Sequence, residues 1–130
     1  MKVFLIRPIR NISPEMEKKI EDYVTKLEAN CIEVYDPYRD TEQDDSTGLN
    51  ICLSNLKAIS EADEVHIAGT SQGCIFDFGM AFALRKKIKI IEDLFPMEEL
   101  NSPNKCFAKV MKTCENFRRY LCDECRWSDE

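Results

Sequence analysis

The sequence predicts an α/β domain in which strands and helices alternate and the strands form a mostly parallel sheet of four or five strands. Two observations predict this class. Short apolar runs rich in strand-forming residues recur at 2–7, 31–35, 64–69 and 88–91. Longer segments with apolar residues at helical spacing lie between these runs, which is the pattern of βαβ units. A chain of 130 residues suits one domain, so we expect residues 1–130 to form a single one.

The first predicted strand is followed by a clear helix start. Arg7, at the end of the strand, either faces a ligand crevice or pairs with an acidic neighbour on the surface. Ser13 is a good N-cap residue, and Pro14 suits the first helical position. The apolar residues that follow share one helical face and are Met16, Ile20, Tyr23, Val24 and Leu27. We therefore expect a helix over about 14–30 that covers the sheet.

The second predicted strand ends in a long polar loop at 36–45. Loops at the carboxyl ends of parallel strands are where open α/β sheets bind ligands. Tyr35 and Tyr38 flank this exit, where an aromatic ring either stacks on a base or simply anchors the loop. Leucine and isoleucine at helical spacing then predict a helix from 49 to about 60.

The third predicted strand leads into a turn of small and polar residues at 69–74. The apolar segment 75–84 is long enough for a buried helix. Three basic residues at 85–87 close this helix, as the dipole at a helix C-terminus favours. A short fourth strand is expected directly after them.

The last predicted element is an amphipathic helix at about 104–122. Its apolar stripe has alternating spacings of three and four and consists of Phe107, Val110, Cys114, Phe117 and Leu121. Such a stripe packs on the protein's own core or forms a subunit interface. Together the elements predict a Rossmann-like or flavodoxin-like three-layer sandwich.

The charge balance and the hydropathy pattern exclude some functions. The formal net charge is -6, and a duplex-binding surface needs a clustered excess of Lys and Arg, so we expect no duplex nucleic acid as a partner. No apolar stretch approaches the ~20 residues that cross a bilayer. The apolar start is too short for a secretory signal. We therefore expect a cytoplasmic protein with no membrane partner.

Seven cysteines are present, and a cytoplasmic chain keeps its thiols reduced. Cys122 and Cys125 form a single C-x-x-C motif, whereas a structural zinc site needs four ligands. Either Cys114 or Cys106 would have to join this pair as a further ligand. His66, the one histidine of the sequence, cannot supply the ligands that are still missing. A zinc or redox protein is therefore the least favoured reading, and we expect no metal. His66 itself lies within a strand, where a packed imidazole is more common than a catalytic one.

The loop from Ser71 into the next helix is the segment that indicates chemistry. It places a hydroxyl and backbone N–H groups at a helix N-terminus, where unpaired donors and the dipole favour an anion. Asp77 lies about one turn inside that helix among apolar residues. A carboxylate there is costly to bury without a partner or a task. We therefore interpret Asp77 as a functional residue.

Three segments resemble the nucleoside 2-deoxyribosyltransferase superfamily. Residues 71–79 are similar to the family segment that reads Gly, three residues, Glu, any residue, Gly. Residues 55–63 resemble the preceding helix of the family with its Ala-Asp boundary, and residues 4–10 resemble its first strand and ligand loop. These matches span most of residues 3–91 in the right order.

Within that superfamily the chain is most similar to the 2'-deoxynucleoside 5'-monophosphate N-glycosidases. Ile9 and Arg10 stand in the place of the Ile-Arg pair of their first loop, and Ser71 stands where they have a phosphate-binding serine. The resemblance implies that Arg10, Ser71 and the amide of Gly73 hold a 5'-phosphate and that Asp77 takes the place of the nucleophile. It also implies a homodimer or larger homo-oligomer, with a neighbour's C-terminal segment completing the pocket. The chemistry implies no metal or organic cofactor.

Two residues depart from the family pattern. Asp77 is one methylene shorter than the usual Glu, and a misplacement of ~1 Å at a reacting centre can lower the rate on the order of 100-fold. Asn55 stands where the family has an acid beside the sugar, and an amide is no general base. Substitute carboxylates would come from the loop acids Asp36, Asp40, Asp44 or Asp45.

Two functions follow from the resemblance and from these departures. One is an N-glycosidase or deoxyribosyltransferase that acts at C1' of a (deoxy)nucleoside 5'-monophosphate, with Asp77 and Asn55 as its catalytic positions. Cleavage of an N-glycosidic bond gives C1' oxocarbenium character, which a nearby carboxylate stabilises or traps as an ester. The other function is a catalytically weak or inactive module that binds or senses a nucleotide.

Overall fold

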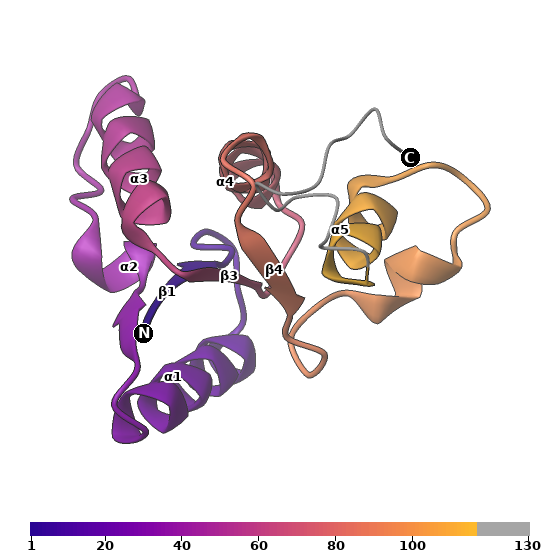
Figure 1. Ribbon diagram of the computed structural model, residues 1–130, viewed down its shortest axis with the longest axis horizontal. Helices are drawn as coiled ribbons and strands as arrows, with labels where there is room; N and C mark the ends of the chain where they lie inside the picture. The colour runs from indigo at the N-terminus through magenta and orange to yellow at the C-terminus, as the bar shows by residue number, and fades with distance from the viewer. Residues whose placement is uncertain (117–130) are drawn as a thin grey trace.

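The computed structural model describes residues 1–116, whose path is shown in Figure 1. The elements in chain order are β1 (Lys2–Ile6), α1 (Pro14–Ala29), β2 (Glu33–Tyr35), α2 (Pro37–Asp40), α3 (Leu49–Glu61), β3 (Glu64–Ile67), α4 (Gln72–Ala83), β4 (Lys87–Ile90), the 3-10 helix η1 (Met97–Asn101) and α5 (Phe107–Asn116). None of the helices described is both long enough and apolar enough to cross a membrane.

The described strands form one parallel sheet in the order β2-β1-β3-β4. β1 is central and pairs with β2 on one side and with β3 on the other, so that Phe4 lies opposite both Tyr35 and Val65. β3 in turn pairs with β4, with Ile67 opposite Ile90. Because all of these strands run the same way, the loops after them meet at one edge of the sheet. The predicted α/β class and parallel sheet are confirmed.

Helices cover both faces of the sheet, as the three-layer prediction requires (Figure 1). α3 and α4 pack on one face, where Phe4 and Ile67 of the central strands are fully buried. α1 packs on the other face, where Ile20 and Val24 contact the cluster around Leu5. Burial of one aliphatic or aromatic side chain contributes about 1.5–3 kcal/mol, so these two clusters hold the three layers together.

α5 lies beside β4, at the edge of the sheet (Figure 1). Its buried residues Ala108, Met111 and Cys114 join the core on the α4 side. Glu115 accepts a hydrogen bond of 2.6 Å from the backbone N–H of Ile90, a group that an edge strand otherwise leaves unpaired. The predicted C-terminal helix is therefore present over Phe107–Asn116, and the remainder of its apolar stripe, Phe117 and Leu121, lies outside the described residues.

Local capping explains where the structure differs from the expected boundaries. α2 lies in the segment for which the sequence predicts a loop, because Asp36 accepts the N–H of Tyr38 at 3.0 Å and Pro37 occupies the first helical turn. η1 lies between β4 and α5, in a segment for which the sequence predicts neither a helix nor a strand. α4 begins earlier than the apolar run predicts, because Ser71 is its N-cap and accepts the N–H of Cys74 at 3.3 Å.

Candidate active site

A cleft of about 490 Å³ lies where the loops after β1 and β3 meet α3 and α4. Its lining comes from four parts of the chain and consists of Arg7, Ile9, Arg10, Asn11, Gln43, Ile51, Cys52, Asn55, Ser71, Gln72, Gly73, Phe76 and Asp77. The cleft brings together every site residue that the sequence indicates except Tyr38. It lies at the carboxyl ends of neighbouring parallel strands, which is the common ligand position in open α/β sheets.

Asp77 is the buried acid of this cleft. Its residue is 9% exposed, and burial raises the pKa of its carboxyl group from 3.8 to about 6. The amide nitrogen Nδ2 of Asn55 lies 3.4 Å from each carboxylate oxygen, and this hydrogen bonding opposes the rise in pKa. These bonds are long, and they offset only part of the effect of desolvation on the pKa. Asp77 is therefore mostly ionised at pH 7 and takes up a proton just below it, as a group that does chemistry near neutrality should.

Asn55 is held on its other side by a residue that sequence reasoning missed. The hydroxyl of Thr41, at the end of α2, donates to Oδ1 of Asn55 at 2.8 Å. The phenol oxygen of Tyr35 lies 2.6 Å from the same hydroxyl. Thr41 lies in an acidic loop, and its sequence carries no signal that the chain folds it against α3.

The N-terminus of α4 opens onto the same cleft. Ser71 and Gly73 are exposed there, and a Cβ added to Gly73 would meet no atom within 4 Å. The backbone N–H groups of Gln72 and Gly73 belong to the first helical turn and have no acceptor within the helix. The Ser71 Oγ contacts Cys74 through the cap and also lies 3.2 Å from its Sγ. An anion at this helix end would meet unpaired donors and the positive end of the dipole.

Two arginines follow β1, and they differ in their surroundings. The side chain of Arg7 is fully buried and pairs with Glu17 at 2.5 Å and with Asp36 at 3.6 Å. The sequence leaves open whether Arg7 faces the crevice or pairs with an acidic neighbour, and in the structure it does both. Arg10 is exposed on the cleft, and among the residues described it has no ion pair. Its guanidinium is therefore free to bind an anion.

Tyr38 lies outside the cleft lining. Its ring is 54% exposed and lies under the guanidinium of Arg7, whose Cζ is 4.8 Å from the ring centroid. Phe76, by contrast, lines the cleft and is 53% exposed. The sequence treats Phe76 as part of a buried apolar helix, but helical spacing places it on the same face as Gly73 and Asp77. This helical spacing was the sequence signal that could have identified Phe76 as a cleft residue.

The loop acids do not supply a second carboxylate to the cleft, since none of the four lines it. Asp36 binds the N–H of Tyr38 and pairs with Arg7, while Asp40 accepts from the backbone N–H of Asp36. Asp45 accepts the N–H of Ile51 at 3.0 Å, and this bond lowers the pKa of the exposed Asp45 carboxyl. Among residues 1–116, Asp77 is therefore the one acid that lines this cleft.

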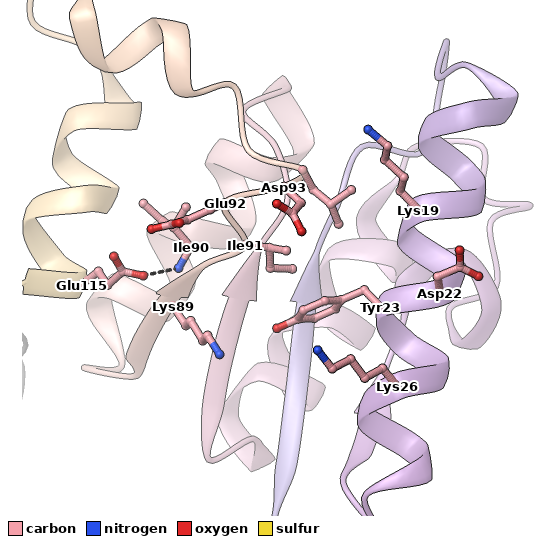
Figure 2. Close-up of a pocket in the computed structure, with 11 residues that line it drawn as sticks. Lys19, Asp22, Tyr23, Lys26, Lys89, Ile90, Ile91, Glu92, Asp93 and Glu115 are labelled. Atoms are coloured by element: carbon pink, nitrogen blue, oxygen red, sulfur yellow. Dashed lines mark hydrogen bonds between the residues drawn. The ribbon is translucent and has the colours of Figure 1, made fainter.

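A second cleft, of about 690 Å³, lies on the α1 side of the sheet between α1 and the end of β4 (Figure 2). Charged side chains of both signs surround it, and they are Lys19, Asp22, Lys26, Lys89, Glu92, Asp93 and Glu115. It contains none of the residues that the sequence indicates for the site. Its mixed charge and its distance from the loops after β1 and β3 leave the smaller cleft as the candidate site.

His66 belongs to a hydrogen-bonded network beside this second cleft. Its Nδ1 lies 2.7 Å from the Tyr23 hydroxyl, and its Nε2 lies 3.0 Å from Oε1 of Glu64. Burial lowers the pKa of His66 and raises the pKa of Tyr23 to about 12. A neutral imidazole that bridges a phenol and a carboxylate is a packed strand residue, as the sequence indicates.

No metal centre is formed within residues 1–116, where no three His, Cys, Asp or Glu side chains are grouped to hold an ion. Cys106 and Cys114 are free thiols. Cys122 and Cys125, the C-x-x-C pair, lie outside the described residues.

Comparison with known proteins finds similar chains among solved structures. No protein-family profile matches the chain, and no curated protein sequence does. Among solved structures, the CMP N-glycosidase BcmB of Clostridium botulinum is 32% identical over 69% of this chain and 70% of that one, with a TM-score of 0.49. The likeness to BcmB rests on its sequence identity rather than on the superposition. A 2-deoxyribosyltransferase of Bacillus psychrosaccharolyticus is 17% identical over 85% of this chain and 96% of that one, with a TM-score of 0.57, which shows the same flavodoxin-like fold.

Proposed function

This chain belongs to the nucleoside 2-deoxyribosyltransferase superfamily, on the side of its nucleotide N-glycosidases, and from that premise we propose that it acts at C1' of a nucleoside 5'-monophosphate. The sugar is transferred to water in an N-glycosidase and to a second base in a deoxyribosyltransferase. The observation that carries the proposal is the presence in one cleft of a buried carboxylate, Asp77, and of Ser71 and Gly73 at the N-terminus of α4, where an anion would meet unpaired N–H groups. A nucleoside monophosphate needs both, one at C1' and the other at the 5'-phosphate.

The proposed reaction follows from the position of Asp77. Its carboxylate attacks C1' as the bond between C1' and the base nitrogen breaks, and the bonding electrons leave with the base, which takes up a proton from water. The resulting sugar ester is then attacked at C1' by water or by a second base, the proton that this nucleophile loses neutralises the hydroxide left by the first step, and the Asp77 carboxylate is released. The steps balance without a metal or an organic cofactor.

Three groups are proposed to hold the 5'-phosphate. Arg10 supplies a free guanidinium, Ser71 a hydroxyl and Gly73 a backbone N–H. Ile9 lines the cleft beside Arg10 and shapes the loop. Tyr38 and Phe76 are the exposed aromatic residues nearest this region, and Phe76 is the better placed to stack on a base because it lines the cleft.

The test is chromatographic detection of free base after incubation with nucleosides and their 5'-monophosphates. The Asp77→Ala variant should release no base while it still binds the monophosphate, and Asp93→Ala, which removes an acid on the other cleft, should retain full activity. Base release by Asp77→Ala at the wild-type rate would refute the role of this carboxylate.

A second candidate function is a module that binds a nucleotide without turning it over. Asn55 favours it, because an amide occupies the position at which the resemblance places an acid. Thermal stabilisation by a monophosphate without base release would support this function. If only the catalytic groups have been lost, the double variant Asp77→Glu with Asn55→Asp should gain measurable hydrolysis. A double variant that binds the monophosphate but releases no base would indicate that the pocket serves binding alone.

We also propose that the chain assembles as a homodimer or larger homo-oligomer through the outer faces of α3 and α4. Lys57 and Glu61 are the exposed charged side chains of these two helices, whereas Leu49, Leu53 and Phe76 are more than half exposed. Analytical ultracentrifugation should give a mass above one chain, and Leu53→Glu should reduce it. Thr25→Glu on the charged outer face of α1 is the control and should leave the mass unchanged.

A further inference from the structure

A line of hydrogen bonds runs through the interior from β2 to α4. The Tyr35 hydroxyl lies 2.6 Å from Oγ1 of Thr41, which lies 2.8 Å from Oδ1 of Asn55. Nδ2 of Asn55 then lies 3.4 Å from both carboxylate oxygens of Asp77. Thr41 and Asn55 are each 5% exposed, so solvent does not replace these partners.

The direction of each bond is fixed by what the groups are able to donate. An amide oxygen only accepts, so the single hydroxyl proton of Thr41 must point at Oδ1 of Asn55. Tyr35 is then the donor to Thr41 at 2.6 Å, and its longer contact of 3.3 Å with the backbone carbonyl oxygen of Asp40 is the weaker of the two. With Oδ1 bound in this way, the amide nitrogen of Asn55 faces Asp77. The opposite orientation of the amide is disfavoured because it would place the amide oxygen against an ionised carboxylate, while the Thr41 hydroxyl would accept from the amide nitrogen instead of donating to the amide oxygen.

We propose that Thr41 is a positioning residue that acts through Asn55, holding the amide nitrogen toward Asp77 and thereby favouring the ionised, nucleophilic carboxylate. This inference rests on the proposed function, because it assigns Thr41 a part in the readiness of Asp77 for attack. Thr41 does not line the cleft, so it reaches the reacting atoms only through Asn55.

The other groups around Asp77 leave this role open to Asn55. Cys74 precedes it by one turn of α4, and burial raises the pKa of that thiol, so it stays neutral. Arg7 faces the cleft from the end of β1 but is paired with Glu17 and Asp36. Arg10 on the next loop and Cys52 on α3 line the cleft. Asn55 is the group that forms a hydrogen bond with the Asp77 carboxylate among the residues described.

Removal of the Thr41 hydroxyl has a direct consequence for Asp77. Without it the Asn55 amide is free to turn, and the oxygen of the turned amide accepts a hydrogen bond from the protonated Asp77 carboxyl group instead of the amide nitrogen donating to the carboxylate. The protonated carboxyl group then gains a partner and the carboxylate loses one, so the pKa of Asp77 rises above its value in the wild type.

The experiment compares the wild type with Thr41→Val, which keeps the shape of the side chain, and with Thr41→Ser, which keeps its hydroxyl. The pKa of Asp77 is read from the pH titration of its 13C-labelled carboxyl carbon, assigned by the loss of that signal in Asp77→Asn. We expect Thr41→Val to raise the pKa by roughly 0.5–1 pH unit, the size of one hydrogen bond. Thr41→Ser should restore the wild-type value. An unchanged pKa in a folded Thr41→Val protein would overturn the inference, as would a Thr41→Ser protein that behaves like the valine variant.

Two further measurements complete the test. If Thr41→Val does not fold, Tyr35→Phe removes the outermost donor instead, and it should raise the pKa of Asp77 by a smaller amount; no rise would count against the line of bonds. Where base is released, the acidic limb of the kcat profile should move to higher pH in Thr41→Val, while KM at high pH stays within about twofold. The titration needs no substrate, so it tests the role of Thr41 even if the protein cleaves no nucleotide. If base is released but the pKa of Asp77 is unchanged in Thr41→Val, the positioning role of Thr41 is rejected and the proposed function is not.

Discussion

Arg7 at the end of β1 and Glu17 in the first turn of α1 form an ion pair with a closest N–O distance of 2.5 Å. A second nitrogen of the guanidinium donates to the other carboxylate oxygen at 3.1 Å, so the pair is bidentate. The Arg7 side chain has no exposed surface, whereas that of Glu17 is 25% exposed. The pair connects the loop that contains Arg10 to α1, the helix that covers the face of the sheet opposite to α3 and α4.

Loss of the Glu17 carboxylate should destabilise the protein. Glu17→Ala leaves a buried guanidinium whose remaining acidic partner is Asp36 at 3.6 Å, and we expect a loss of about 2–4 kcal/mol in the free energy of unfolding. Glu15→Ala is the matched control, because it removes an exposed acid from the same first turn and the same helix dipole. Urea unfolding of both variants measures the difference. Equal stabilities would show that the pair contributes nothing beyond the dipole.

Asp77 should make the protein less stable as the pH rises. Its pKa in the folded state, about 6, is higher than its ordinary value of 3.8, so between these values the folded state holds a proton that the unfolded state has lost. Stability therefore falls with pH across this window, by up to about 3 kcal/mol. Asp77→Asn should be more stable than the wild type at pH 7.5, and the difference should disappear near pH 3.5. Chemical denaturation at several pH values tests this, and a pH-independent difference would contradict it.

Arg10 should discriminate between nucleotides and nucleosides. Arg10→Gln removes the free cation of the cleft, and we expect the KM for a 5'-monophosphate to rise roughly 10–100-fold, as for one charged hydrogen bond. The kinetic constants for the nucleoside should hardly change. Lys19→Gln removes the same charge from the exposed surface of α1 and serves as the control. An equal effect on nucleoside and nucleotide would mean that Arg10 does not contact the phosphate.

Gly69 and Gly79 should respond in opposite ways to alanine. A Cβ at Gly69 would lie 2.9 Å from Cδ of Pro8, whose ring is unable to move aside, so Gly69→Ala should lower the stability by about 1–3 kcal/mol. A Cβ at Gly79 would meet nothing within 4 Å on the exposed side of α4, and Gly79→Ala should raise the stability by up to about 1 kcal/mol. Thermal unfolding of the pair distinguishes these effects, and two changes of the same sign would refute the contact with Pro8.

Much of the fold could be predicted because its signals are local. Ser13 with Pro14 marks the start of α1, and apolar runs separated by helical patterns predict the strands and their parallel direction. The start of α4 was predicted too late, because the apolar run begins inside the helix while Ser71 caps it earlier. Position 71 shows that a cap defines a helix start better than hydrophobicity does.

The candidate site could be predicted where a residue's role depends on its own segment, and it was missed where the role depends on contacts between segments. Arg10, Asn55 and Asp77 meet in one cleft because each follows or covers a central strand. Thr41 and Glu17 gain their roles from partners on other elements. Their types and spacings say nothing of those partners, because a threonine in a polar loop and a glutamate on a charged helix are ordinary surface residues.

The central position of β1 also sets the order in which the cleft forms during folding. We expect the loop that carries Arg10 to meet the N-terminus of α4 only after β1 has paired with β3, from which α1, β2, α2 and α3 separate it in the chain. Contacts between distant segments form late, because the entropy of closing the loop opposes them until the pairing is made. On refolding, the far-ultraviolet signal of the helices should therefore recover before the ability to bind a nucleotide. By the same reasoning we expect the proposed ligand site to form during synthesis only after α4 has followed β3 onto the sheet.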